Sequence, residues 1–235
     1  MESHERVPQP DVHAISARMW PTALAVCILA LLYVHLLFQF DRFTTNFLPA
    51  ELHALFDLDE EQNVPSWFSG AQLLVAAALA WTLASAARRV TPGDARAWSG
   101  LAAALAFMSL DEIAGIHETF NTLFVMSWTV PFGILALVIG AILLPFVRRL
   151  PARTRNGIGL AGAVYLAGAV GMELLTSRFF DQDNKRQFSY ALMTLVEEGL
   201  EMTGVWILIR TLLAHMSACG ITLAVLREPR AGRTR

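Results

Sequence analysis

Residues 19–40 read MWPTALAVCILALLYVHLLFQF and contain no aspartate, glutamate, lysine or arginine. A helix that crosses the hydrocarbon core of a bilayer needs about 20 consecutive, mainly apolar residues, so this stretch is long enough to cross once. It is too long for the apolar part of a signal peptide and lacks a small-residue cleavage site, so we expect it to remain in the protein. The stretch therefore predicts a membrane protein.

The rest of the chain repeats this pattern. The 235 residues are 55% hydrophobic and 16% charged, whereas soluble domains carry about 25% charged residues. The charged residues are concentrated between apolar runs, and we place six spans at residues 19–40, 66–87, 97–118, 127–147, 157–178 and 190–214. The predicted fold class is all-α: a polytopic bundle of six transmembrane helices at 19–214, between a polar segment at 1–18 and a basic tail at 215–235.

The positions of arginine and lysine predict the orientation of these spans. Cytoplasmic segments of membrane proteins carry an excess of both residues. One alternate set of segments holds 13 of them and the opposite set holds only Arg42, Arg178, Lys185 and Arg186, while Arg210 lies inside the last span. We therefore expect both termini to be cytoplasmic, and the acidic loop after the first span to lie outside.

The candidates for function are ionisable residues inside the predicted spans. They occur in SLDEIAGIHE at 109–118, in GME at 171–173 and in VEEGLEM at 196–202, which together carry seven carboxylates and one histidine. Each charge at the centre of a bilayer costs on the order of 3 kcal/mol. Residues retained at this cost are expected to face the interior of the bundle.

Helical spacing indicates that these residues form one group. At about 100° per residue, Asp111 and Glu118 share a face of the third span with His117 at its edge. In the sixth span, residues 197, 198 and 201 fall within one arc of about 100°. We therefore expect the third, fifth and sixth spans to place their carboxylates in one layer of the outer half of the membrane.

So many carboxylates cannot all remain ionised without a counter-charge, so they either share protons or hold a cation. Oxygen ligands suit Mg²⁺, Ca²⁺ or Mn²⁺, and a histidine also suits Zn²⁺ or Fe²⁺. We predict a divalent metal ion held by Asp111, His117, Glu118, Glu173, Glu198 and Glu201, with Glu112 and Glu197 as catalytic residues. Alternatively, some of these residues have only a structural role: an acid would then be protonated and hydrogen-bonded to a neighbouring helix, and the histidine would be packed between helices.

A second acidic cluster, DLDEEQN at 57–63, lies in the predicted outer loop. It has acids at the first, third and fifth positions of a calcium loop, but Gln62 replaces the required glycine and Phe68 the required glutamate. This excludes an EF-hand. We expect these acids to be solvated at the membrane interface.

The stretches at 56–69 (FDLDEEQNVPSWFS) and 109–118 (SLDEIAGIHE) resemble a group of uncharacterised bacterial multi-pass inner-membrane proteins that share both motifs. The resemblance covers about a tenth of the chain. It implies a location in the bacterial inner membrane and brings no established activity.

Three kinds of function fit these residues. The first is a metal-dependent membrane hydrolase acting on a lipid or lipid-linked substrate, with membrane lipids as partners and no role for nucleic acid. The second is a transporter of protons or divalent cations that uses the same acids. The third is a non-catalytic accessory protein. Residues 97–108 are almost entirely apolar, so no polar path leads from the acids to the cytoplasm along the third span, which favours the enzyme.

Overall fold

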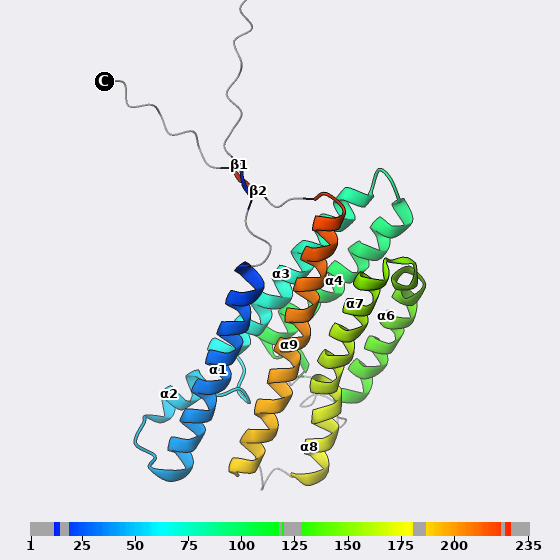
Figure 1. Ribbon diagram of the computed structural model, residues 1–235. Coiled ribbons are helices and arrows are strands. Elements are labelled where there is room, and N and C mark those ends of the chain that lie inside the picture. Colours follow the sequence, from blue (N-terminus) through cyan, green and yellow to red (C-terminus); the bar gives the residue numbers. More distant parts are fainter. Residues whose placement is uncertain are drawn as a thin grey trace, which may run out of the picture.

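A computed structural model describes residues 12–14, 19–117, 119, 128–180, 187–221 and 224–226 as a bundle of long helices (Figure 1). The long helices are α1 (Met19–Thr44), α3 (Val64–Ala87), α4 (Pro92–Ala114), α6 (Thr129–Arg149), α7 (Ala152–Leu166) and α9 (Phe188–Ala218). Shorter elements are α2 (Ala50–Leu55), the π-helical turn η1 (Ala167–Met172), α8 (Glu173–Phe179) and the paired strands β1 (Val12–Ala14) and β2 (Ala224–Leu226). The fold is therefore essentially all-helical, with a helix at each of the six predicted positions.

Local sequence explains where several helices begin. Asn63 caps α3: its side chain accepts a hydrogen bond from the Ser66 amide, and the Ser66 hydroxyl accepts one from the Asn63 amide. Pro92 occupies the first turn of α4, where a missing N–H removes no helical bond. Leu150 and Pro151 are extended, so the chain reverses sharply between α6 and α7.

The two ends of the bundle differ in charge, and Figure 1 shows which elements lie at each end. The start of α1, the end of α9, and the α3–α4 and α6–α7 turns lie at one end. Basic residues gather there, namely Arg88, Arg89, Arg148, Arg149, Arg153 and Arg155. The short helix α2 and the acidic loop at 56–63 lie at the opposite end, called the α2 end below.

Four helical stretches are long and apolar enough to cross a membrane: α1, α3, α6, and α7 continued through η1 and α8. Helices α4 and α9 run alongside them (Figure 1) but are less apolar, because α4 carries Asp111 and Glu112 and α9 carries Glu197, Glu198 and Glu201. At about 1.5 Å per residue, both exceed the roughly 30 Å of a hydrocarbon core. Length does not distinguish them from the other four.

The packed core lies where α3, α4 and α9 meet. Small residues of α3, including Ala76, Ala80 and Ala84, are fully buried and pack near Trp98 and Leu105 of α4. Small side chains let helices approach closely, and dispersion contacts rather than the hydrophobic effect hold helices together in lipid. The α3–α4 pair is therefore closely packed.

Helix α6 is the most loosely packed of the long helices. Among the described residues, its main contacts are with α4, α7 and η1, and residues such as Leu137 and Ile142 are each 71% exposed. An exposed apolar face of this size suits contact with lipid chains rather than with water.

Candidate functional site

A cavity of about 470 Å³ lies between the α3–α4 pair and α6 on one side and α7, η1 and α9 on the other. Eight carboxylates line it: Asp59, Glu61, Asp111, Glu112, Glu173, Glu197, Glu198 and Glu201. His117 is the one basic residue among the described lining residues. We call this region, which lies toward the α2 end, the acidic end of the cavity.

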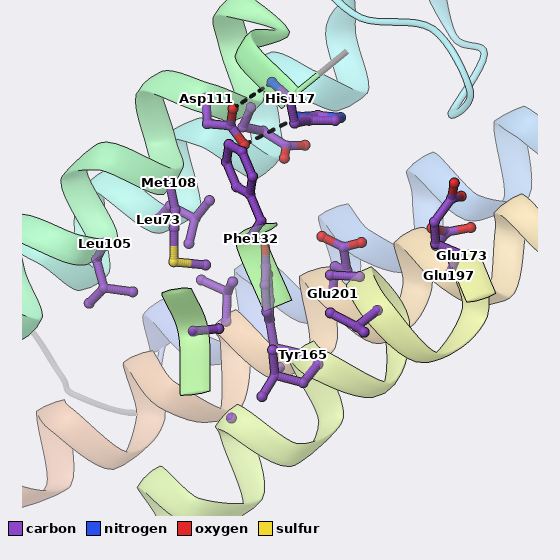
Figure 2. Close-up of a pocket in the computed structure, with 18 of the residues that line it drawn as sticks. Leu73, Leu105, Met108, Asp111, His117, Phe132, Tyr165, Glu173, Glu197 and Glu201 are labelled. Atoms are coloured by element: carbon purple, nitrogen blue, oxygen red, sulfur yellow. Dashed lines mark hydrogen bonds and ion pairs between the residues drawn. The ribbon is translucent and has the colours of Figure 1, made fainter. Parts of the chain in front are cut away.

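The remainder of the cavity is apolar. Its wall includes Leu101, Leu105, Met108, Ile139, Ile158 and Leu208, which we call the apolar limb. Figure 2 shows Leu105 and Met108 gathered on one side of the view, with Glu197 and Glu201 on the other. The cavity is therefore amphiphilic along its length.

Helix α4 builds one side of the acidic end through a tight turn. The helix stops at Ala114 because Gly115 adopts a left-handed conformation (φ 59°), which glycine reaches without a steric penalty. The chain then folds back, and the Asp111 carboxylate accepts a hydrogen bond from the His117 amide (3.0 Å) and contacts His117 Nδ1 (3.2 Å; Figure 2). His117 Nε2 lies 3.6 Å from Glu61 Oε1, and its ring packs against Trp128.

The turn at Gly115 corrects the expected third span. A continuous helix over 97–118 would put His117 at the edge of the Asp111 face, but α4 ends at Ala114. His117 meets Asp111 because the chain reverses, not because of helical spacing. Glu118 lies outside the described residues.

The loop at 56–63 is folded into the protein, so the expectation of solvated acids is wrong for Asp57. This residue is 5% exposed, and its carboxylate accepts bonds from Gln39 (2.9 Å) and Arg42 (3.1 Å). His35 accepts a bond from the Leu58 amide (3.1 Å), and the Asn63 side chain donates to the Asp57 carbonyl (2.6 Å). These bonds hold Asp59 and Glu61 at the cavity.

Helix α9 supplies the opposite side through Glu197, Glu198 and Glu201. Tyr165 of α7 lies close enough to Glu201 to interact with it electrostatically. Figure 2 shows Glu173 of α8 beside Glu197, and both interact electrostatically with Tyr190. This side of the site is formed within the α7–η1–α8 and α9 unit.

Close helix packing brings these acids together. A Cβ on Gly204 would lie 2.8 Å from the Tyr165 backbone, and a Cβ on Gly168 would lie 2.7 Å from the Glu197 carbonyl oxygen. Only glycine permits such an approach. The π-helical turn η1 also widens the helix between Tyr165 and Glu173, both of which line the cavity; such turns are frequent at functional sites.

Seven of the eight site residues expected from the sequence line this one cavity: Asp111, Glu112, His117, Glu173, Glu197, Glu198 and Glu201. They form two groups on opposite sides of the cavity. Helix α9 packs against α1, α3, α7 and η1, and faces the acids of α4 across the cavity. Glu112 interacts electrostatically with both Glu198 and Glu201, so the two groups are coupled.

Four further residues of the site were not expected from the sequence: Asp59, Glu61, Tyr165 and Tyr190. The Tyr190 hydroxyl donates a 2.6 Å hydrogen bond to Asp59. Asp59 and Glu61 directly precede the Asn63 cap with Pro65 in the first turn, and that motif could have placed them at the mouth of a span. A tyrosine within an apolar run carries no comparable indication.

A second cavity of about 420 Å³ lies at the α2 end, between the end of α1, the loop and the start of α9. Its wall includes Arg42, Asp57 and Glu60. Asp59, Tyr190 and Thr194 line both cavities. We call this second cavity the vestibule; the Asp59–Tyr190 hydrogen bond lies in the wall that the two cavities share.

The donor atoms suit a divalent cation, but no ligand set is preformed among the described residues. Carboxylate oxygens with one imidazole match the preferences of Mg²⁺, Mn²⁺, Zn²⁺ and similar ions. Within the ranges described, no three histidine, cysteine or acidic side chains converge as a ligand group. An ion shared by both sides would require the side chains or helices to move closer together.

Fold and site together define a class of protein: a bundle containing helices apolar enough to cross a membrane, with a carboxylate-lined cavity in its interior. Residues 23–216 match the family model described as Domain of unknown function (DUF8692), and the chain belongs to this family. The match includes every described residue of the cavity wall. No curated protein and no solved structure matches the chain.

Proposed function

We propose that this protein is a six-span protein of the bacterial inner membrane, with cytoplasmic termini, and that its cavity is the site of a divalent-metal-dependent enzyme acting on a lipid or lipid-linked substrate. One observation carries the proposal: a single cavity joins eight carboxylates and a histidine to an apolar limb. A polar end and an apolar wall are the features that an amphiphilic substrate requires.

The proposed ligands come from both sides of the cavity. Asp111 and His117 lie on one side, while Glu173, Glu198 and Glu201 lie on the other. Glu61 joins the set through its 3.6 Å contact with His117, and Glu118 remains a proposed ligand outside the described residues. A bound divalent ion would polarise an ester or phosphoryl oxygen of the substrate.

Glu112 and Glu197 are the proposed catalytic residues, and their positions differ. Glu112 interacts electrostatically with His117 on its own side and with Glu201 across the cavity. Glu197 lies near Glu173 and Tyr190, beside the wall shared with the vestibule. A general base must lie within hydrogen-bonding reach of the water or hydroxyl that it activates, so the more central Glu112 is the better candidate.

The arrangement also supports orienting roles for Asp111 and Tyr165. Asp111 holds the His117 ring through Nδ1, which leaves Nε2 on the side of Glu61. A second partner of this kind fixes the tautomer and direction of a histidine ligand. On the other side, the proximity of Tyr165 to Glu201 supports a similar role for Tyr165 toward that carboxylate.

The second candidate function is transport of protons or divalent cations through the same acids. The observation that favours it is the vestibule, which adjoins the acidic end through Asp59 and Tyr190. A transporter also needs a polar route to the other side, and the cavity continues from the acids into the apolar limb. The enzyme is therefore preferred, and a non-catalytic accessory role is the third option.

The test is elemental analysis of purified protein together with thermal unfolding, with and without chelator. Binding to the native state adds about 2.7 kcal/mol at a hundredfold excess of metal over Kd. We expect Glu198→Gln and His117→Ala to lose most of this gain. Glu51→Gln is the matched control, because Glu51 is exposed on α2 and lines neither cavity.

Metal-free protein whose unfolding ignores chelator and added ions would overturn the metal-dependent enzyme. In that case, proton uptake into reconstituted vesicles that is lost in Glu198→Gln would establish the transporter instead.

A further inference from the structure

We infer that the apolar limb is a binding site for one acyl chain of a bilayer phospholipid, which enters sideways from the membrane between α6 and α7. The inference rests on the proposed function and names the chain-binding part of that site.

The first observation is the ordering of residues along the helices that line the cavity. On α4, Leu101, Leu105 and Met108 precede Asp111 on the way to the α2 end. On α9, which runs the other way, Glu198 and Glu201 come first and Val205 and Leu208 follow. Each of these helices is polar toward the α2 end and apolar toward the basic end.

The limb has the length of a substantial part of a lipid chain. Leu101 lies ten residues from Asp111 along α4, which is about 15 Å at a rise of about 1.5 Å per residue. The limb therefore extends through about half of a 30 Å hydrocarbon core. Buried water is held by hydrogen bonds to polar groups. The apolar side chains that define the limb offer none, so the limb suits a hydrocarbon chain better than water.

The second observation concerns two glycines in the cavity wall, Gly140 of α6 and Gly162 of α7. A Cβ built on either residue meets no atom within 4 Å, and both residues are exposed. The cavity therefore borders the outer surface of the bundle at these positions, where no side chain closes it.

The two glycines lie at similar depth. Helices α6 and α7 are antiparallel and joined by the turn at Leu150–Pro151, so Gly140 and Gly162 are each about eleven residues from it, or about 16 Å. That depth is near the middle of the proposed membrane. The neighbouring surface of α6 is apolar, with Leu137 71% exposed.

The occupant follows from these surroundings. A side opening at mid-membrane depth, beside an apolar surface, meets lipid chains and not water. At the far end, eight carboxylates suit a polar head only when a cation accompanies it. A phospholipid held with its phosphate near a bound divalent ion and one chain in the limb satisfies both ends of the cavity.

The experiment uses full-length protein in bilayer nanodiscs that contain a phospholipid with a photoreactive group in its acyl chain, followed by mapping of the crosslinked residues. We expect crosslinks at Leu105 and Leu208 in the limb, and at Leu137 on the lipid-facing surface. Gly140→Leu and Gly162→Leu should each reduce the limb crosslinks several-fold and leave those at Leu137 unchanged.

The chain offers matched controls on the same two helices. Gly133 of α6 and Gly159 of α7 also have open space around a built Cβ, but neither lines the cavity. Gly133→Leu and Gly159→Leu raise helix propensity equally and should leave the limb crosslinks intact. Leu208→Phe fills the limb from a third helix, α9. This variant can be used in the experiment if either glycine variant fails to fold.

The outcomes separate this inference from the proposed enzyme. Limb crosslinks that persist in chelator, in a protein that never binds metal, would support the chain site while overturning the metal-dependent enzyme. Metal binding with crosslinks only at Leu137, or limb crosslinks unaffected by the filled variants, would overturn the chain site while leaving the enzyme.

Discussion

Gly115 shows how one residue determines the geometry of the site. Its left-handed conformation (φ 59°) ends α4 and returns His117 to Asp111. The nearest atoms to a Cβ at this position would belong to the Glu61 side chain, at an ordinary 3.6 Å. The requirement for glycine is therefore a requirement of the backbone and not of space.

Replacing Gly115 with alanine should lower stability by about 1 kcal/mol, because the left-handed region costs other residues roughly 1–2 kcal/mol and part of this is offset in the unfolded chain. Thermal unfolding in detergent measures the change. The control is Gly100→Ala, in the interior of α4 with open space around it, which should be neutral or stabilising. Equal effects of the two variants would contradict the role of the turn.

The sequence was sufficient to predict which acids of the apolar runs are turned away from lipid. Asp111, Glu198 and Glu201 could be predicted to face the interior because a charge inside an apolar run is costly. Glu61 could not, because its polar neighbours make a solvated position equally reasonable. Its place depends on bonds between distant segments, such as the His35 ring with the Leu58 amide.

Among the elements, α7 and α9 pack so closely at Gly204 that a larger residue there cannot be accommodated without movement of the backbone. A Cβ on Gly204 would lie 2.8 Å from Tyr165 N and 2.9 Å from its Cα. Backbone atoms cannot rotate away as the end of a side chain can, so the helices must separate. Separation would move Tyr165 away from Glu201.

Gly204→Ala should therefore destabilise the protein by about 1–3 kcal/mol, the usual cost of overpacking, and should also weaken any metal binding. Gly199→Ala is the matched control on the same helix, because its Cβ would lie 3.5 Å from the Leu32 side chain, an ordinary contact. Chemical or thermal unfolding of both variants provides the comparison. A Gly204→Ala protein as stable as the wild type would contradict the close approach of α7 and α9 at this glycine.

Apolar runs of about 20 residues predicted the positions of the helices well, because length and composition suffice for that purpose. Their irregularities could not be predicted. The break at Gly115 depends on one backbone conformation, and the π-helical turn at Ala167–Met172 depends on how α7 packs beside α9. Both irregularities lie at the cavity, and neither changes the composition of the run in which it occurs.

At the scale of the whole molecule, the testable feature is orientation. The basic residues around Arg89 and Arg149 lie at the same end of the bundle as the start of α1 and the end of α9. Arginine-rich ends remain in the cytoplasm. Reporter fusions at Arg89, at Arg149 and at the C-terminus should therefore report a cytoplasmic location.

A reporter fusion in the loop at Asp57 is the control for these fusions, and it should report a location on the outer side of the membrane. A C-terminus found outside would make the number of crossings odd and would contradict the six-span arrangement.

In the proposed six-span arrangement, the low hydropathy of α4 and α9 would affect how the chain enters the bilayer as it is synthesised. Each central charge adds about 2.5–3.5 kcal/mol to the insertion of an isolated helix. Helix α4 follows α3 directly and packs along it, so the two can enter as a hairpin. Helix α9 is made last, and its neighbours α1, α3, α7 and η1 are spread over the whole preceding chain. If α9 crosses the membrane, it can pack against these partners only after all of them have been made, so chains that stop before α9 would lack the three acids of this helix.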